Sequence, residues 1–384
     1  MDVIDLDKSA AEIARKHLLK GMTFRELGRI YHASPSTIQR RLTKWLAKNR
    51  FDLHDRMGEK KTAVIISRDD ELGERLARKT GIWRARVVHI AGAEEAYHAE
   101  YLKEPDDGQS QAANRASDEL HRCLGEVAGE MILNSLRKNI TVGLSSGRGV
   151  GFAVEKMGEL IQRTPSWGKG FESARLVSLC GGAHIGMCES SNRRDFDADE
   201  NIFTLASLLK VPRRNVSYMI GPVSSSQSIA ERWPRTRLNL DLAVIGLGQL
   251  STRHHYFRDY NELQLKALSG PIHELIELQT RDPEQAGCIA EIVLRLYPTN
   301  RTVLAPEYNE AIKKTNSTIV AVPPESLKKA GEIMLIAGGM QKLAALSGIL
   351  KGECSEAPIE KTSLTLITDA WTAEQLLKRI YDTT

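Results

Sequence analysis

The sequence predicts an α/β protein in which a small all-α domain is followed by a larger domain built on a mostly parallel sheet. Apolar runs of strand length alternate with helical patterns through most of the chain, which is typical of a parallel sheet covered by helices on both faces. Glycines follow several of these runs. Near the start of the chain, a basic segment with helical spacing predicts the small domain.

Charge separates these two parts. The chain has 384 residues, which is long enough for two or three domains. Residues 8–50 carry 11 lysines and arginines against 2 acidic residues, whereas the remainder carries 42 against 47. A basic segment joined to a mildly acidic body indicates a module that binds a polyanion, although a solvated pair of charged helices has the same composition.

The basic segment is expected to begin with two short helices. Residues 8–20 place apolar side chains at helical spacing, and Gly21 ends that helix. Thr23 and Glu26 have the spacing of a capping box, which opens a second helix. The side chains expected to face inward from this second helix are Phe24, Leu27 and Ile30.

A third helix is expected over roughly residues 35–48, with Ser34 as its N-cap and Pro35 at its first position. A short helix, a tight turn and a helix that begins with polar groups have helix-turn-helix geometry, in which Gln and Arg side chains can read base edges. A helical protein-interaction module is the alternative. The residues expected to contact DNA are Ser34, Ser36, Thr37, Gln39, Arg40, Arg41 and Lys44.

The α/β domain is expected to follow a polar linker. The predicted boundaries are residues 1–50 for the helix-turn-helix domain, 51–61 for the linker and 62–384 for the α/β domain. Strands are expected at residues 62–67, 85–90, 140–145, 174–180, 240–248, 317–323, 333–338 and 363–368, with helices over 114–137 and 197–210.

Four glycine-bearing turns follow expected strands: SSGRG, CGG, GLGQ and AGG. Ligands of parallel sheets bind at the carboxyl ends of the strands, so these turns together outline one rim. A glycine-rich turn after a strand often cradles a phosphate, although glycine is also the default residue of ordinary turns.

The order of the motifs resembles a known family. Behind the helix-turn-helix come VGLSSGRG, DLAVIGLG, AGCIAEIVLRLY, IMLIAGGMQKLAALSGILKG and LTLITDAWTAEQLL, and together they resemble the SorC family of bacterial transcriptional regulators. The resemblance covers most of the chain, and the last two motifs are the most specific. It implies a C-terminal domain with a fold like that of ribose-5-phosphate isomerase and glucosamine-6-phosphate deaminase, which binds a sugar or sugar phosphate as effector.

The resemblance also implies site residues. It places the phosphate loop on Ser145–Gly149, an acceptor of sugar hydroxyls on Glu291 and a cation on Lys342. With the neighbouring rim, the expected effector site comprises Ser145, Ser146, Gly147, Arg148, Gly149, Cys180, Gly181, Gly182, Gly248, Glu291 and Lys342. The alternatives are a solvated helix face for Glu291, because AEIVLRLY is amphipathic, and an ordinary helix start for Lys342.

Two positions depart from the family pattern. Gly149 lies where members that bind sugar phosphates usually carry a hydroxyl residue, and Cys180 lies where some carry arginine. Cysteine cannot make the bidentate contacts with which arginine holds a phosphate. The sequence therefore leaves open both a phosphorylated and an unphosphorylated effector.

Other kinds of site have weaker support. Cys180, His184 and Cys188 are spaced four apart, as zinc ligands on a helix would be, but the glycines at 181 and 182 disfavour a helix there. We therefore expect no metal and no cofactor. Five cysteines without a CxxC pair argue against a disulfide framework and for a reducing cytoplasm. No apolar run is long enough to span a bilayer, and no signal peptide is evident.

The sequence thus predicts a cytoplasmic regulator, not an enzyme, that binds double-stranded operator DNA and a sugar-like effector. Helix-turn-helix domains usually act in pairs, so we expect a homodimer or homotetramer. The runner-up is a sugar-phosphate isomerase or deaminase with a fused helical domain, for which Glu291 and Lys342 would be the acid/base candidates. A third hypothesis is a DNA-partitioning or structural protein whose pocket is vestigial.

Overall fold

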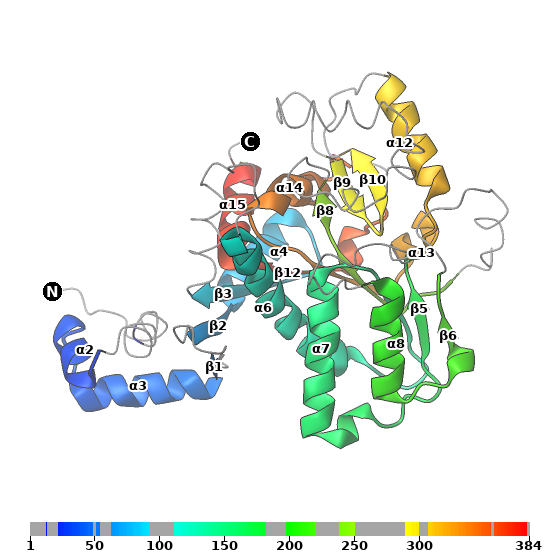
Figure 1. The fold of residues 1–384 in the computed structure, drawn as a ribbon. Helices are drawn as coiled ribbons and strands as arrows, with labels where there is room; N and C mark the ends of the chain where they lie inside the picture. Colours follow the sequence, from blue (N-terminus) through cyan, green and yellow to red (C-terminus); the bar gives the residue numbers. More distant parts are fainter. Residues whose placement is uncertain are drawn as a thin grey trace.

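A computed structural model of the chain reveals a helical N-terminal region and a large α/β body (Figure 1). It describes residues 13, 22–48, 51–53, 63–91, 111–181, 197–219, 238–249, 289–298, 306–354 and 357–381. Within these residues, none of the helices has the length and apolar character that crossing a membrane requires.

The second and third predicted helices of the N-terminal region are confirmed as α2 (Phe24–Ile30) and α3 (Pro35–Lys48). The capping box is also confirmed, because Glu26 N donates to Thr23 Oγ1 at 3.2 Å and Thr23 N donates to Glu26 Oε2 at 2.7 Å. Of the expected helix at 8–20, only Ile13 lies among the described residues, where it is helical and buried.

A small core joins these helices. Its buried members are Ile13, Leu27, Tyr31, Ile38 and Leu42. The expectation that Ile30 faces inward is wrong: this side chain is 42% exposed, because it lies at the last position of α2 and outside that core. The turn between the helices is tight, since a Cβ on Gly28 would lie 2.6 Å from the carbonyl oxygen of Ala33.

The body is built on a nine-stranded sheet in the order β1-β2-β3-β12-β11-β7-β4-β5-β6. These strands are β1 (Phe51–Leu53), β2 (Ala63–Asp69), β3 (Arg84–Ala91), β12 (Leu364–Asp369), β11 (Glu332–Ile336), β7 (Leu242–Gly246), β4 (Thr141–Leu144), β5 (Arg175–Ser178) and β6 (Val216–Ser217). From β3 to β6 every pairing is parallel, whereas β2 is antiparallel to both β1 and β3. The predicted mostly parallel sheet is therefore confirmed.

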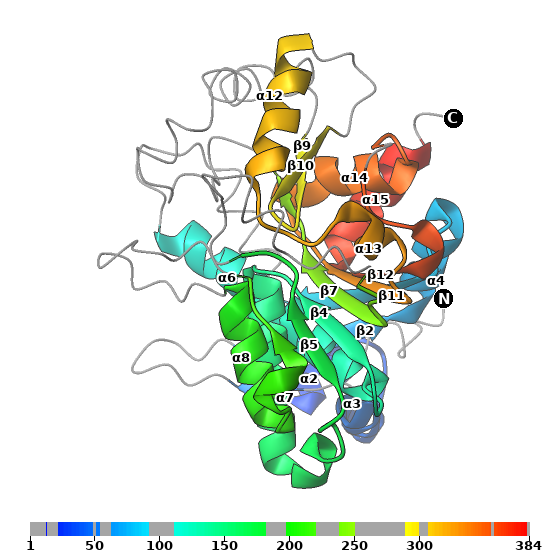
Figure 2. The ribbon, with the colours of Figure 1, turned by 90° about the vertical axis from the view of Figure 1, so that its right-hand side faces the viewer.

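Helices cover both faces of this sheet (Figures 1 and 2). One face carries α6 (Gln111–Ser135), α7 (Arg148–Arg163) and α8 (Ala198–Leu209), and the other carries α4 (Asp70–Thr80), α13 (Pro324–Lys328), α14 (Leu343–Lys351) and α15 (Ala370–Tyr381). The period of a strand explains the arrangement: Ile333 and Leu335 of β11 belong to one core, and Met334 and Ile336 to the other.

A second, three-stranded antiparallel sheet lies beyond the carboxyl end of β7. It comprises β8 (Gly248–Gln249), β9 (Ile289–Ile292) and β10 (Arg295–Pro298), and α12 (Pro306–Thr318) contacts β10. Short 3₁₀ turns complete the described elements: η1 (Pro165–Gly168), η2 (Arg213–Asn215), η4 (Met340–Lys342) and η5 (Lys361–Ser363).

Three segments differ from the sequence-based expectation. Residues 317–323 form no regular strand: α12 extends to Thr318, and Ala321 makes only an isolated bridge to Cys180. Residues 51–53, expected within the linker, form strand β1 on β2. The amphipathic segment at 290–297 is a hairpin rather than the helix weighed for Glu291.

Candidate functional site

The predicted glycine-bearing turns lie at one edge of the large sheet. Strands β11, β7, β4 and β5 are parallel neighbours, and each is followed by one of these turns. The loop Ser145–Gly149 follows β4, Cys180 and Gly181 follow β5, Gly248 lies just after β7, and Gly339 lies just after β11. The carboxyl edge of the sheet is where ligands of this architecture bind. The expected residue Gly182 lies outside the described residues.

Hydrogen bonds fix the loop that joins β4 to α7. Ser145 N donates to Val244 O at 3.0 Å, and Gly246 N donates to Ser145 Oγ at 3.1 Å, so the loop is tied to β7. Asn201 Nδ2 of α8 donates to Ser145 O at 3.2 Å. Ser145 is itself buried, which makes it a support of the loop, whereas the partly buried Ser146 lies next to Cys180, with 3.6 Å between Oγ and Sγ.

The loop ends at the start of a long helix. Gly147 is the N-cap of the 16-residue α7, has a φ of 122° and makes no side-chain capping bond. Only glycine adopts such a φ readily, and a Cβ added there would meet nothing within 4 Å. The first amides of a helix lack helical acceptors and favour oxygen-rich or anionic groups, so this turn suits a ligand of that kind.

The departure at Gly149 has a packing reason. A Cβ at this position would lie 2.8 Å from Ile336 Cγ2, a side chain of the sheet core. A residue with a Cβ at this position would therefore require the Ile336 side chain to shift. Gly149 is thus explained by close packing of α7 on the sheet.

Two cations, one in this loop and one from the turn after β11, contact α6. Arg148 Nη1 lies 2.7 Å from Asp118 Oδ1, and Lys342 Nζ lies 3.0 Å from His121 Nε2. His121 Nδ1 lies 2.6 Å from Ser117 O. Because a carbonyl oxygen only accepts, Nδ1 carries the proton and Nε2 accepts from the Lys342 ammonium.

Glu291 lies opposite Gly248 in the small sheet. The two residues are register partners of β9 and β8, and a Cβ on Gly248 would lie 2.5 Å from Glu291 Oε2. Burial raises the pKa of Glu291 from 4.5 to about 7, and the attraction of Lys342 opposes that rise. The short distance from a Cβ at position 248 to Glu291 Oε2 means that a glycine there leaves room for the carboxyl group.

Lys342 shares the same electrostatic environment. Its pKa falls from 10.5 to about 7, because burial and the nearby Arg148 lower it, while Glu291 opposes the shift. The structure thus brings together three residues that lie far apart in the sequence: Arg148, Glu291 and Lys342.

The last sequence motif anchors the turn that carries Lys342. Gly339 N donates to Asp369 Oδ2 at 2.9 Å, and Lys342 N donates to Gly339 O at 3.1 Å. Asp369 is fully buried and also accepts from Thr372 N and Thr372 Oγ1. A Cβ on Gly338 would lie 2.3 Å from Asp369 Oδ2. The glycine pair and the ITD-x-x-TA ending therefore form one unit.

Cys180 is fully buried at the same rim. Burial raises the pKa of its thiol to about 12, and Asp197 and Glu291 contribute to the rise, so the group is a neutral thiol at physiological pH. His184 and Cys188, its companions in the weighed zinc pattern, lie outside the described residues. Among the residues that are described, no group of His, Cys, Asp and Glu could hold a metal ion.

The sequence missed Asp118 and His121. Both lie on α6, whose helical pattern was evident, but nothing in a helical pattern tells which of its polar side chains meets a turn more than 200 residues away. In the sequence they are two of many polar and charged residues on this helix, and nothing distinguishes them from the others.

The expected DNA-contacting residues lie at and after the start of α3. Ser34 Oγ accepts from Thr37 N at 3.1 Å and lies 2.9 Å from Ser36 Oγ, so Ser34 caps the helix as the sequence predicts. Arg40 is exposed and Arg41 is partly buried. The side chains of Gln39 and Lys44 lie outside those that the structure describes.

Comparison with solved structures identifies the fold. The chain superposes on a transcriptional regulator from Streptococcus pneumoniae TIGR4 with a TM-score of 0.51 and 16% identity, over 82% of this chain and 97% of that one. It also superposes on a domain assigned to sugar binding in a transcriptional repressor from Vibrio fischeri, with a TM-score of 0.51 and 14% identity, over 82% and 100% of the two chains.

The full-length sorbitol operon regulator SorC from Klebsiella pneumoniae aligns over 97% of this chain and 99% of its own, at 17% identity and a TM-score of 0.49. No protein-family model and no curated protein matches the sequence. The body therefore has the α/β fold of the Streptococcus and Vibrio proteins, and at these identities the likeness concerns the fold alone.

Proposed function

We propose that this protein is a DNA-binding transcriptional regulator whose α/β domain senses a small hydroxylated effector. One observation carries the proposal: the loop Ser145–Gly149, Glu291 and Lys342 come from three distant segments and meet at the carboxyl edge of a parallel sheet. The likeness of fold to domains from transcriptional regulators supports it.

The chemistry of the site favours a sugar, a polyol or a sugar-phosphate-like compound. Glu291 supplies an acceptor for hydroxyl groups, and Lys342 supplies a donor whose proton is easily gained or lost, because its pKa is about 7. The first turn of α7 offers backbone donors beside Ser146. Such a mixture of donors and acceptors suits a ligand rich in oxygen.

The proposed DNA interface is the exposed side of α3. Arg40 and the hydroxyls of Ser34 and Ser36 lie at its amino-terminal half, where the second helix of a helix-turn-helix reaches base edges. The effector would act by binding two conformations with different affinity and so shifting affinity for the operator. We further propose a homodimer or homotetramer in the cytoplasm, since one helix-turn-helix domain covers a single half-site.

A second candidate function is acid/base catalysis at the same site. It is favoured by one observation: a carboxyl group and an amine with pKa values of about 7 share one environment. Turnover assays with sugar phosphates and amino-sugar phosphates distinguish an enzyme from a sensor.

The proposal is tested in two steps. Duplexes selected by the full-length protein from a random pool give an operator, whose binding should weaken steeply with salt, because phosphate contacts release counterions. Thermal-shift screening of sugars, polyols and their phosphates then gives the effector, which should change operator affinity. A protein that selects no duplex contradicts the DNA-binding half, and an effector that leaves operator affinity unchanged contradicts the sensor half.

A further inference from the structure

We propose that helix α6 couples the effector site to the DNA-binding head, with Asp118 and His121 as positioning residues at one end and Glu130 as the link at the other. This inference rests on the proposed function and names how the site would regulate DNA binding. It follows from contacts along α6 that the proposed function itself does not use.

The amino-terminal half of α6 touches both cations of the site. Asp118 pairs with Arg148 at 2.7 Å, and His121 accepts from Lys342 at 3.0 Å. Arg148 begins α7, whereas Lys342 belongs to the turn after β11. A ligand that draws either cation toward itself therefore pulls directly on α6.

The middle of α6 is packed too closely against α7 to move separately. A Cβ on Gly125 would lie 2.8 Å from Gly149 O, and one on Gly129 would lie 2.5 Å from Ala153 O. The buried Lys156 of α7, whose side chain is 2% exposed, lies 3.3 Å from Glu126 Oε2. Lys156 also pairs with Glu159 of α7 itself at 3.0 Å, so its ammonium links a carboxylate of α7 to a carboxylate of α6.

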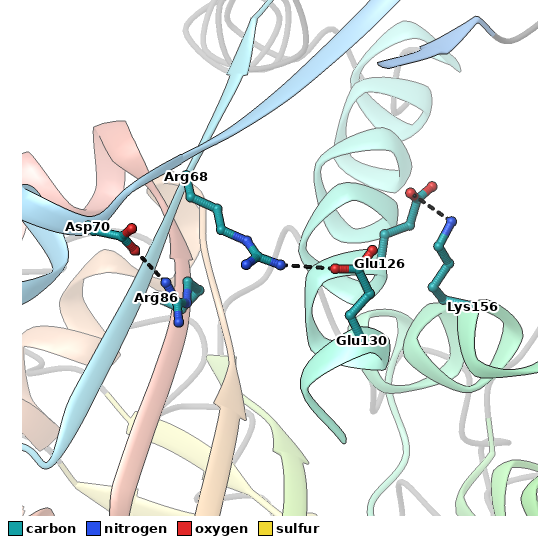
Figure 3. A network of polar contacts seen from close by, with 6 residues as sticks. All are labelled: Arg68, Asp70, Arg86, Glu126, Glu130 and Lys156. Atoms are coloured by element: carbon teal, nitrogen blue, oxygen red, sulfur yellow. Dashed lines mark hydrogen bonds and ion pairs between the residues drawn. The ribbon is translucent and has the colours of Figure 1, made fainter. Parts of the chain in front are cut away.

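The carboxyl-terminal half of α6 reaches the strand next to the head. Glu130 Oε2 lies 2.9 Å from Arg68 Nη2 of β2. Figure 3 shows Arg68 extending from β2 to Glu130 of α6, with the Glu126–Lys156 pair one turn along the same helix. The 12 residues from Asp118 to Glu130 span about 18 Å along the helix axis, so the two ends are too far apart for direct contact.

Strand β2 is connected to the helix-turn-helix through β1. It pairs with β1, in the register Phe51 to Ile65 and Leu53 to Ala63, and β1 begins three residues after Lys48, where α3 ends. A displacement of α6 against the sheet is therefore transmitted through the Arg68–Glu130 pair to β2, and from β2 to β1, the strand that follows α3.

The test uses amide hydrogen exchange of the full-length protein with and without its selected operator duplex, and needs no effector. Coupling is reciprocal, so an operator bound at the head must perturb the effector site. We expect the duplex to change exchange rates in residues 117–124 and 147–150 by about two- to fivefold, the range that an exposed ion pair supports. In Glu130→Gln and Arg68→Gln, at least half of that change should be lost.

The matched control is Arg137→Gln. Arg137 lies just beyond the end of α6 and pairs at 3.1 Å with Asp241, the residue before β7, in a more exposed ion pair than Arg68–Glu130. This variant should respond to the duplex as the wild type does. The inference is overturned if the duplex protects α3 but leaves residues 117–124 unchanged, or if Glu130→Gln responds like Arg137→Gln. Failure of the duplex to protect α3 would instead contradict the proposed DNA binding.

Discussion

The two proposed binding surfaces of this protein are built in opposite ways. The residues proposed to contact DNA lie within one short stretch, 34–44, on a helix over a core of five buried residues. The effector site is assembled from turns after β4, β5, β7 and β11, a hairpin strand and α6. A contiguous surface tolerates substitution without structural consequence, whereas an assembled site depends on the packing that brings its parts together.

The largest effect is expected at Gly338. Its substitution by alanine would place a Cβ 2.3 Å from the buried Asp369 Oδ2 and disrupt the turn that carries Lys342. We expect a loss of about 3 kcal/mol in the free energy of unfolding, measured by urea denaturation. Gly158→Ala is the control, because Leu208 lies 3.5 Å away and alanine favours the helix; it should be neutral or slightly stabilising. Equal stability of the two variants would contradict the packing argument.

The contiguous surface should behave differently. Arg40→Ala removes an exposed side chain from α3, so the free energy of unfolding should not change measurably. Its affinity for the selected operator should fall by about 1–3 kcal/mol, measured by fluorescence anisotropy, if Arg40 contacts a base. Operator binding at the wild-type level would show that the recognition surface lies elsewhere.

The pH dependence of stability tests whether Glu291 and Lys342 have shifted pKa values in the assembled site. The pKa of Glu291 rises on folding from 4.5 to about 7, so its stabilising contribution is complete below pH 4.5 and is lost as the pH rises to 7. The pKa of Lys342 falls from 10.5 to about 7, so its contribution is complete above pH 10.5 and is lost as the pH falls to 7.

Glu291→Gln should therefore gain stability relative to the wild type as the pH rises from 4.5 to 7, by on the order of 2 kcal/mol. Lys342→Met should gain relative stability as the pH falls from 10.5 to 7. Denaturation at a series of pH values checks both slopes. A difference between variant and wild type that is constant with pH would mean that neither group is perturbed.

The same contrast explains what the sequence could and could not predict. Capping residues, strand runs and the glycines after strands are local signals, and these predicted α2, α3, most of the sheet and the rim. The β9–β10 hairpin was missed because Val293 and Leu294, at its turn, have φ values of 52° and 66°. Such turns usually carry Asn or Gly, and two apolar residues there are compatible with the amphipathic helix that the sequence suggested.

The contacts between distant residues of the site could not be predicted from the sequence either. The role of Asp369 depends on Gly339, 30 residues earlier, and that of His121 depends on Lys342, 221 residues later. No periodic pattern in the sequence connects such positions. The resemblance to a family supplied Glu291 and Lys342, and only the fold supplied the contacts that hold them.

Lys342→Ala tests the proposed sensing mechanism, because Lys342 belongs to the proposed effector site and also contacts α6 through His121. We expect this variant to bind the selected operator as tightly as the wild type, and we expect that affinity to stay unchanged when the compound found by thermal-shift screening is added. A Lys342→Ala protein that responds at the wild-type concentration of the compound would contradict the account.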